Sequence, residues 1–534
     1  MADSPASGVQ LAEQSRTELA IERVPTGVVA FVGRTLKGPV NHAVTVRGFV
    51  EFQQRFGGLW QPSTLSYAVE QFFENGGREA RIVRVVNGAR PPTLTLPAAA
   101  GALRLTAINA GSREYLRASV DYDGLVLTDN EHFNLVVQRV RTAGSELVED
   151  QEIYRRVCIA AGSARCVREV LLESRLVRIL GALPVLRPDR TAGGPGGVAA
   201  GYTLSNPDGD DGAPLTDYDV IGSAASATGL FALHGEQGFN MLCIPPLTRE
   251  RDVGLSTLLV AARICRERHA LLVVDPPANW TTARIALDAM RLWPFRSDSA
   301  VMYYPRVQAF DRLRGRVEVF SSCGAAAGMI ARSDETWPVW AAAESEEAIL
   351  RPGLRPAVVV SEADRTRLAA AGINTFLSVR SGVRTGVSPR TLSGSGVSDW
   401  RYLSARRLAL FVAASIEQGT RWTLLEHNGP AMWERARAQV GTFLDGLAEQ
   451  GAFAGDAEET HFVIADERLN RPSTLAEGKF NLLFGFATSK PGAFDTWLVT
   501  HRAGLSRVRP VSVNRSATSK NRVEWEIETA ILRN

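Results

Sequence analysis

The spacing of apolar residues predicts alternating strands and helices at the start of the chain. Val28–Val32 is a short apolar run, Pro62–Phe73 carries apolar residues at helical spacing, and Ala80–Val86 is a second short run. This order of strand, helix and strand is typical of a parallel α/β unit. The same alternation returns further along, as two apolar runs with a helical pattern between them: Met241–Pro245, Leu255–Arg268 and Leu271–Asp275.

Between residues 88 and 202 the pattern changes to that of a β-rich domain. Gly and Pro mark both edges, at Pro91-Pro92 and Gly193–Gly197, and Phe133–Val137 has strand-like alternation. We therefore predict a domain inserted between a first core part, residues 26–87, and a middle α/β domain, residues 203–397.

Two amphipathic helices are predicted in the next part, residues 398–500. One covers Trp400–Gln418, and the other runs from Pro430 to Gln450 after a predicted N-cap at Asn428. Between the two helices, Arg421–Leu425 is predicted as a strand.

Both ends of the chain carry a short alternating segment without a hairpin partner nearby. Residues 1–25 form a predicted arm whose strand spans Leu19, Ile21 and Val24. In the last part, residues 501–534, the apolar residues alternate with glutamates: Val523, Trp525 and Ile527. A strand without a local partner either docks on its own domain or pairs with another molecule.

Composition narrows the class of protein. The chain has 534 residues, 45% hydrophobic and 22% charged, which is typical of a folded protein with two to four domains. Its net charge is +3, and 56 of the 60 basic residues are arginines without a concentrated basic run, so no nucleic-acid partner is predicted. The five cysteines are scattered, as expected for small buried side chains in a reducing compartment. No apolar run is long enough for a membrane span, and the first residues lack a secretory signal, so synthesis in the cytoplasm is expected.

The usual catalytic patterns are missing from the sequence. The acidic run Asn206–Gly212 contains Asp208, Asp210 and Asp211 but does not fit a calcium loop, so an acidic turn is the favoured interpretation. Asp275 follows a predicted buried strand, where a carboxylate could serve a ligand site, but no acid or base accompanies it. We therefore predict no catalytic residue, no cofactor and no metal site, and expect that the chain is not an enzyme.

Several segments resemble the tail sheath proteins of contractile bacteriophages, tailocins and extracellular contractile injection systems. Resembling segments follow the family's order over nearly the whole chain: residues 28–58, 65–85, 215–222, 271–280, 303–305, 400–447 and 481–494. The chain departs from the family at Leu19–Glu22, where a G-V-Y-x-x-E start is common, and the tail from His501 does not align.

The resemblance implies a fold and a function. The implied fold is a mixed α/β core built from both ends of the chain, with an outer inserted domain and terminal arms that add strands to neighbouring subunits. The implied function is that of a structural subunit that polymerises in stacked rings around an inner tube and contracts to drive the tube through a target envelope. On this interpretation the arm-strand residues of both termini lie between subunits.

The implied partners are further copies of the chain, the inner tube protein, and baseplate and tail terminator proteins, without membrane insertion. The implied location is a virion tail or phage tail-like particle that is released by lysis or stays cell-associated. Polar side chains on two arginine-rich helices are the candidates for the tube-facing surface: Arg406, Arg407, Arg435 and Arg437. A baseplate-proximal paralogue is the alternative, and a nucleotide- or metal-dependent α/β enzyme is the least favoured one.

Overall fold

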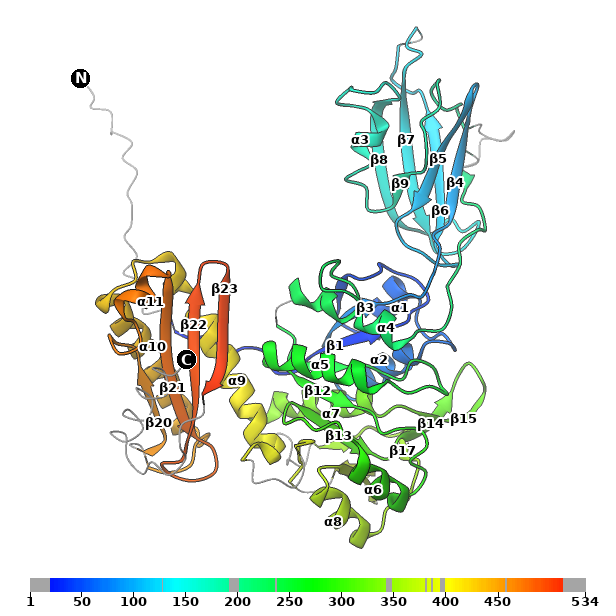
Figure 1. The fold of residues 1–534 in the computed structure, drawn as a ribbon. Coiled ribbons are helices and arrows are strands. Elements are labelled where there is room, and N and C mark those ends of the chain that lie inside the picture. The colour runs from blue at the N-terminus through cyan, green and yellow to red at the C-terminus, as the bar shows by residue number, and fades with distance from the viewer. Residues whose placement is uncertain are drawn as a thin grey trace, which may run out of the picture. The chain divides into compact units, whose positions relative to one another are not determined.

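The computed structural model describes residues 20–126, 128–191, 201–235, 238–341, 348–379, 382–385, 388–393, 399–456 and 459–511. The chain divides into two compact units. We call Pro25–Gly396 the large unit, and Met1–Val24 together with Val397–Asn534 the terminal unit. The predicted mixed α/β class is confirmed by helices and several sheets in the described residues (Figure 1).

A nine-stranded sheet forms the centre of the large unit. Its strands from β3 through β18 run parallel, and antiparallel strands complete both edges. The order across the sheet is β16 (Ile349–Leu350), β19 (Gly382–Thr385), β18 (Asn374–Val379), β13 (Ala300–Tyr304), β12 (Leu271–Val274), β11 (Met241–Cys243), β1 (Val28–Gly33), β3 (Glu79–Arg84) and β2 (Ala43–Val46).

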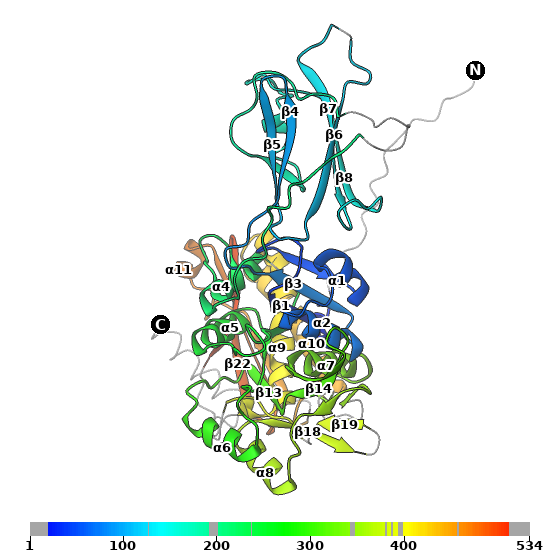
Figure 2. The same cartoon turned by 90° about the vertical axis from the view of Figure 1, so that its right-hand side faces the viewer.

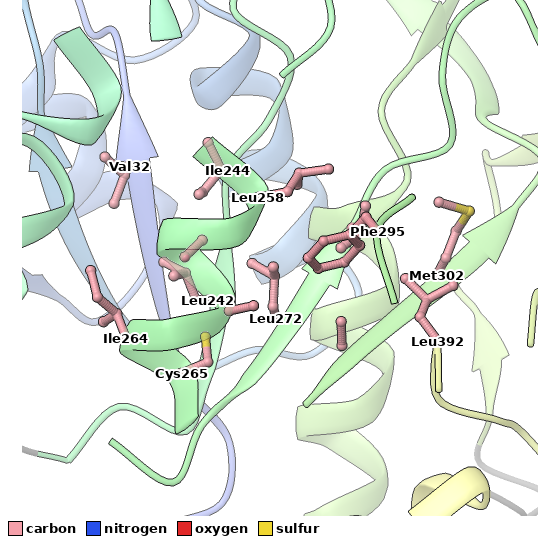
Figure 3. Close-up of a cluster of buried hydrophobic side chains, with 14 of the residues drawn as sticks. Val32, Leu242, Ile244, Leu258, Ile264, Cys265, Leu272, Phe295, Met302 and Leu392 are labelled. Atoms are coloured by element: carbon pink, nitrogen blue, oxygen red, sulfur yellow. The ribbon is translucent and has the colours of Figure 1, made fainter. Parts of the chain in front are cut away.

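Helices cover both faces of this sheet. The helical elements of the large unit outside its inserted part are α1 (Phe49–Phe56), α2 (Thr64–Glu74), α4 (Asp217–Ile221), η1 (Gly229–Gly235), α5 (Leu255–Glu267), α6 (Ala283–Leu292), α7 (Cys323–Thr336) and α8 (Glu362–Ala370). Alternate strand residues point to opposite faces, so Val32 and Leu242 join the α5 side, where Ile264 and Cys265 also lie (Figure 3). On the other face Phe31 packs edge-to-face on Phe72 of α2.

Helices α2 and α7 lie unusually close together on that second face. A Cβ at Gly324 would overlap the carbonyl of Ala68, and one at Gly328 would overlap that of Phe72. These two glycines therefore allow α7 to approach α2 backbone to backbone.

The N-terminal strands join the middle of the chain and not its C-terminal part. β1 pairs with β11, whereas only the residues up to Val24 are grouped with the terminal unit. The large sheet is thus built from the first and middle parts of the chain, whereas the terminal unit groups residues from both chain ends.

The inserted part is a β-sandwich of two sheets (Figure 2). Its buried core consists mainly of leucine and valine side chains. One sheet has the order β4 (Thr93–Ala98), β5 (Gly101–Ala107), β9 (Val177–Ile179); the other has the order β10 (Thr203–Leu204), β6 (Tyr115–Asp121), β7 (His132–Val140), β8 (Val148–Cys158), and the short helix α3 spans Val167–Val170. β10 pairs with β6, so the insertion continues beyond residue 202.

A small sheet beside the nine-stranded one carries a projecting hairpin (Figure 1). Its order is β15 (Arg316–Phe320), β14 (Val307–Asp311) and β17 (Arg355–Pro356), all antiparallel. β15 therefore stands at the end of this sheet.

The terminal unit combines two long helices with a four-stranded antiparallel sheet. Its elements are η3 (Asp399–Arg401), α9 (Leu403–Gly419), η4 (Arg421–Leu425), α10 (Pro430–Glu449), β20 (His461–Ile464), α11 (Pro472–Ala476), β21 (Lys479–Ala487), β22 (Phe494–Arg502) and β23 (Leu505–Val511). The strand order follows the chain, from β20 to β23. Among the described residues, no helix is both long and apolar enough to cross a membrane.

Two local predictions in this unit are wrong. Residues 421–425 form a 3-10 helix and not a strand, because Thr423 N–H bonds back to the Thr420 carbonyl and the turn continues from α9. Asn428 is not the N-cap of α10, since the cap position is Gly429. The Asn428 side chain instead accepts from Trp433 Nε1 at 2.7 Å and donates to the Lys479 carbonyl at 2.9 Å.

Candidate assembly surfaces

The described residues of the N-terminal arm lie against the terminal unit. Ile21 is buried at the end of α9, where a Cβ at Gly419 would come within 2.8 Å of Ile21 Cγ1. Val24 N–H donates to Ser415 Oγ at 3.3 Å, and Arg23 Nη2 donates to Gln450 Oε1 at 2.8 Å. Residues 20–25 form no strand in this single chain, and Leu19 lies outside the described residues. Ile21 thus fastens the base of the arm to its own unit.

Gly419→Ala is expected to destabilise the terminal unit by about 1–3 kcal/mol, because the added methyl group would displace Ile21. In a chain that also carries Ile21→Ala, the same change should hardly lower the free energy of unfolding, because the smaller side chain leaves space for the added methyl group. Gly441→Ala in α10, where nothing lies within 4 Å of the new Cβ, is the control and should stabilise by about 0.5–1 kcal/mol. Urea unfolding of the four variants measures the coupling free energy between Gly419 and Ile21. An equal loss of stability on Gly419→Ala with and without Ile21→Ala would contradict the packing of Ile21 on Gly419.

The C-terminal sheet ends in the strand that leads to the C-terminal tail. β23 pairs with β22 over seven residues, from Leu505↔Arg502 to Val511↔Thr496, and has no partner on its other side among the described residues. An edge of this kind exposes main-chain N–H and C=O groups that can pair with a further strand. The predicted strand residues Val523, Trp525 and Ile527 follow it and lie outside the described residues.

Arg406 and Arg407 are buried, which argues against their predicted place on a tube-facing surface. Each residue is only 5% exposed. The Arg406 guanidinium lies 5.2 Å from the Trp400 ring and 6.0 Å from the Trp497 ring, so cation–π contacts hold it inside. These two residues are not part of the outer face of α9.

Arg435 and Arg437, in contrast, are half-exposed on α10. Arg435 bonds Glu426 at 2.8 Å and stacks over Trp422 at 4.6 Å, and the bond to Glu426 raises the pKa of the Arg435 guanidinium. Arg437 bonds Glu434 at 2.7 Å. Exposed ion pairs of this kind are weak and can be exchanged for contacts with another molecule.

Asp275 lies where a ligand-binding carboxylate would be expected, at the end of β12, but it caps a helix. One of its oxygens accepts N–H bonds from Ser322 at 2.6 Å and Cys323 at 2.8 Å, at the start of α7. Burial raises the pKa of Asp275, and the charge of Arg306 opposes this rise. The space beside it is about 30 Å³, which is far too small for a nucleotide.

The acidic run Asn206–Gly212 lies at the base of the inserted domain. Asp208 accepts from Thr93 N–H at 2.8 Å, and Asp211 accepts from Ser112 N–H at 2.8 Å. Beside them, the buried Arg84 donates to the carbonyls of Gly38 and Ala110, both at 2.7 Å. Burial lowers the pKa of Arg84 to about 10. These bonds join the base of the insertion to β3, so the interpretation as an acidic turn fits the geometry.

In the described part of the chain, no group of three His, Cys, Asp or Glu side chains is arranged to hold a metal ion. The described residues bring together features of surfaces: an anchored arm base, an edge at β23 that pairs with no described strand, and an exposed face on α10. None of them forms a catalytic arrangement.

Comparison with solved structures identifies the fold. A sheath tail protein from Listeria innocua superposes with a TM-score of 0.58 at 12% identity, covering 90% of this chain and 96% of that one. The fold is that of contractile sheath proteins. The sheath of an extracellular contractile injection system in its contracted state matches with a TM-score of 0.53 at 16% identity, covering 92% of this chain and 96% of the other.

A third chain with the sheath fold comes from the contracted baseplate of the anti-feeding prophage. It matches with a TM-score of 0.52 at 17% identity and covers 92% and 95% of the two chains. No protein-family model and no curated protein sequence matches this chain. The sheath fold therefore extends over nine-tenths of the chain, although little sequence identity remains.

Proposed function

We propose that this chain is the structural subunit of a contractile sheath. Copies assemble helically, as stacked rings, around an inner tube, and contraction drives the tube through a target envelope. The observation that carries the proposal is the sheath fold, which covers 90–92% of this chain and 96% of each of the two compared chains. The outer edge of β23, which pairs with no strand among the described residues, supports assembly by strand addition.

In this assembly the terminal arms connect neighbouring subunits. Ile21 and Val24 hold the base of the N-terminal arm, while the preceding residues, with Leu19, reach a neighbour. The C-terminal residues Val523, Trp525 and Ile527 add a strand in the same way. Main-chain hydrogen bonds between arms and sheets survive when the folded bodies move, which a contracting sheath requires.

The energy for contraction comes from subunit interfaces that bury more surface in the shorter helix, without nucleotide. Tube-facing contacts must break during this change, and the exposed pairs of Arg435 and Arg437 suit such a contact. The remaining partners are baseplate and terminator proteins. The complete particle is a virion tail or tail-like particle, assembled in the bacterial cytoplasm and released by lysis or kept on the cell.

A baseplate-proximal paralogue is the second candidate, because one of the matching chains comes from a baseplate. An enzyme is not favoured, since Asp275 is used at the start of α7.

Electron microscopy of the purified chain tests the proposal. Hollow, striated tubes are expected at high protein concentration, with or without the tube protein. A baseplate paralogue would form single rings or short stacks only together with sheath and baseplate partners. A chain that stays monomeric, with all partners present, would contradict both functions.

A further inference from the structure

The hairpin β14–β15 buries Val307, Asp311 and Phe320 on one face and exposes apolar side chains on the other. The register pairs Phe310 with Val317, and Gln308 with Val319, on one face. On that face Phe310 is 60%, Val317 63% and Val319 47% exposed. A hairpin normally buries its apolar face, so this one presents a surface suited to a partner.

The inward face explains why the hairpin is turned this way. Asp311 is buried and accepts from Arg249 at 2.7 Å and from Tyr67 Oη at 3.1 Å. Phe320 stacks on Tyr67 with ring centroids 4.9 Å apart. The ion pair between Arg249 and Asp311 keeps the pKa of the Asp311 carboxyl below its usual range, although burial alone would raise it. The apolar face is thereby fixed toward solvent.

The charges that flank the apolar face are basic where they are exposed. Arg312 and Arg316 are both largely exposed, whereas their acidic partners Glu70 and Glu318 are mostly buried. Arg312 also pairs with the half-exposed Glu74 at 3.2 Å. The rim of the hairpin thus offers guanidinium groups to an approaching carboxylate.

The first half of edge strand β8, with the turn before it, has the complementary character. Glu146 and Asp150 are exposed, and their basic partners Arg117 and Arg139 are mostly buried. Exposed apolar side chains lie between and beside these acids: Leu147, Val148 and Ile153. β8 stands at the end of its sheet, as β15 does in its own.

We propose that the hairpin β14–β15 of one subunit docks on the 146–153 segment of the inserted domain of a second copy of this chain. Two different surfaces meet in this contact, which is the head-to-tail type that builds helical assemblies. The exposed apolar area of the hairpin is on the order of 300–400 Å², less than the ~800 Å² per partner of a stable pair. Such a contact is weak alone and gains strength by repetition, as between copies in a tube. The inference rests on the proposed function.

Charge reversal tests the contact in tubes of the full chain. Arg312→Glu with Arg316→Glu should raise the critical concentration for tube formation at least tenfold, and adding Glu146→Arg with Asp150→Arg to that chain should restore it. The matched control is Arg284→Glu with Arg291→Glu on α6, where both arginines are similarly exposed and pair with Asp288. Phe310→Ser gives a second, uncharged hairpin variant, and thermal unfolding confirms that each variant folds.

Cysteine cross-linking tests which surfaces meet. All five native cysteines are buried, so Val317→Cys and Ile153→Cys add the exposed thiols. On oxidation, a mixture of the two single variants should give a covalent dimer that neither forms alone. Dimers of Val317→Cys alone, or wild-type-like assembly of the reversed hairpin, would overturn the contact. If wild type forms no tubes, the proposed function fails, whereas cross-linking still decides the contact.

Discussion

Removal of residues 1–19 or of residues 512–534 is expected to abolish tube formation and leave a folded, soluble chain. The first deletion stops before Ile21, and the second stops after β23, so the contacts that hold the terminal unit together remain. What is lost is the chain that would add a strand to a neighbour, and with it the main-chain hydrogen bonds between subunits. Pelleting and electron microscopy measure tubes, and urea unfolding measures the fold.

The two deletions also separate the contributions of the arms. Replacing residues 1–19 with a Gly/Ser segment of equal length is the control for length alone. This variant should form no tubes, as expected for the deletion. Tubes that persist in both truncated chains would refute assembly through the arms. Because Ile21 is anchored on its own unit, a deletion that also removed residues 20–24 would confuse loss of assembly with loss of stability.

Strong periodicity in the sequence was enough to place the regular elements. The run at residues 28–32 became β1, and the helical patterns at 255–268 and 430–450 became α5 and α10, each within two residues at either end. These segments bury one continuous face or a whole strand, so tertiary contacts reinforce the local preference. The pairing of β1 with β11, across an insertion, is a non-local choice that periodicity does not encode.

The errors arose where a distant residue decides the outcome. Arg406 looked like a polar residue on a helix face, but Trp497 lies 91 positions further along the chain and closes over it. Similarly, the five residues 421–425 are too few to distinguish a strand from a helical turn, and the connection to α9 made them helical.

The candidate surfaces were only partly visible in the sequence. Arg435 and Arg437 remained exposed, as the helical pattern suggested. The hairpin surface was missed, although Val317 and Val319 alternate with charged residues. Alternation shows that one face is apolar but not which face is buried, and here the ion pair Arg249–Asp311 and the stacking of Phe320 on Tyr67 hold the other face inward.

Acidification is expected to weaken the terminal unit through His501 on β22. Its ring is buried, with Nε2 2.7 Å from Thr420 Oγ1 and Nδ1 2.9 Å from Ser506 Oγ. Burial lowers the pKa of His501 to about 4; the charge of Glu417 raises it and that of Arg421 lowers it. The folded unit thus holds this histidine neutral, whereas the unfolded chain takes up the proton near pH 6.5.

The direction of this pH effect on the free energy of unfolding follows from proton linkage. Between about pH 6.5 and pH 4 the unfolded chain binds more protons at this site, so stability falls as the pH falls, by about 3 kcal/mol in total, and no loss occurs above pH 6.5. His501→Gln should cost about 1 kcal/mol at pH 7.5 through the lost Ser506 bond and should remove this pH dependence. His427→Gln, at an exposed histidine of the same unit, is the matched control and should leave the pH dependence of stability unchanged. Hydrogen exchange of residues 494–511 at several pH values, corrected for intrinsic rates, measures the effect; an unchanged slope in His501→Gln would show that other groups cause the acid sensitivity.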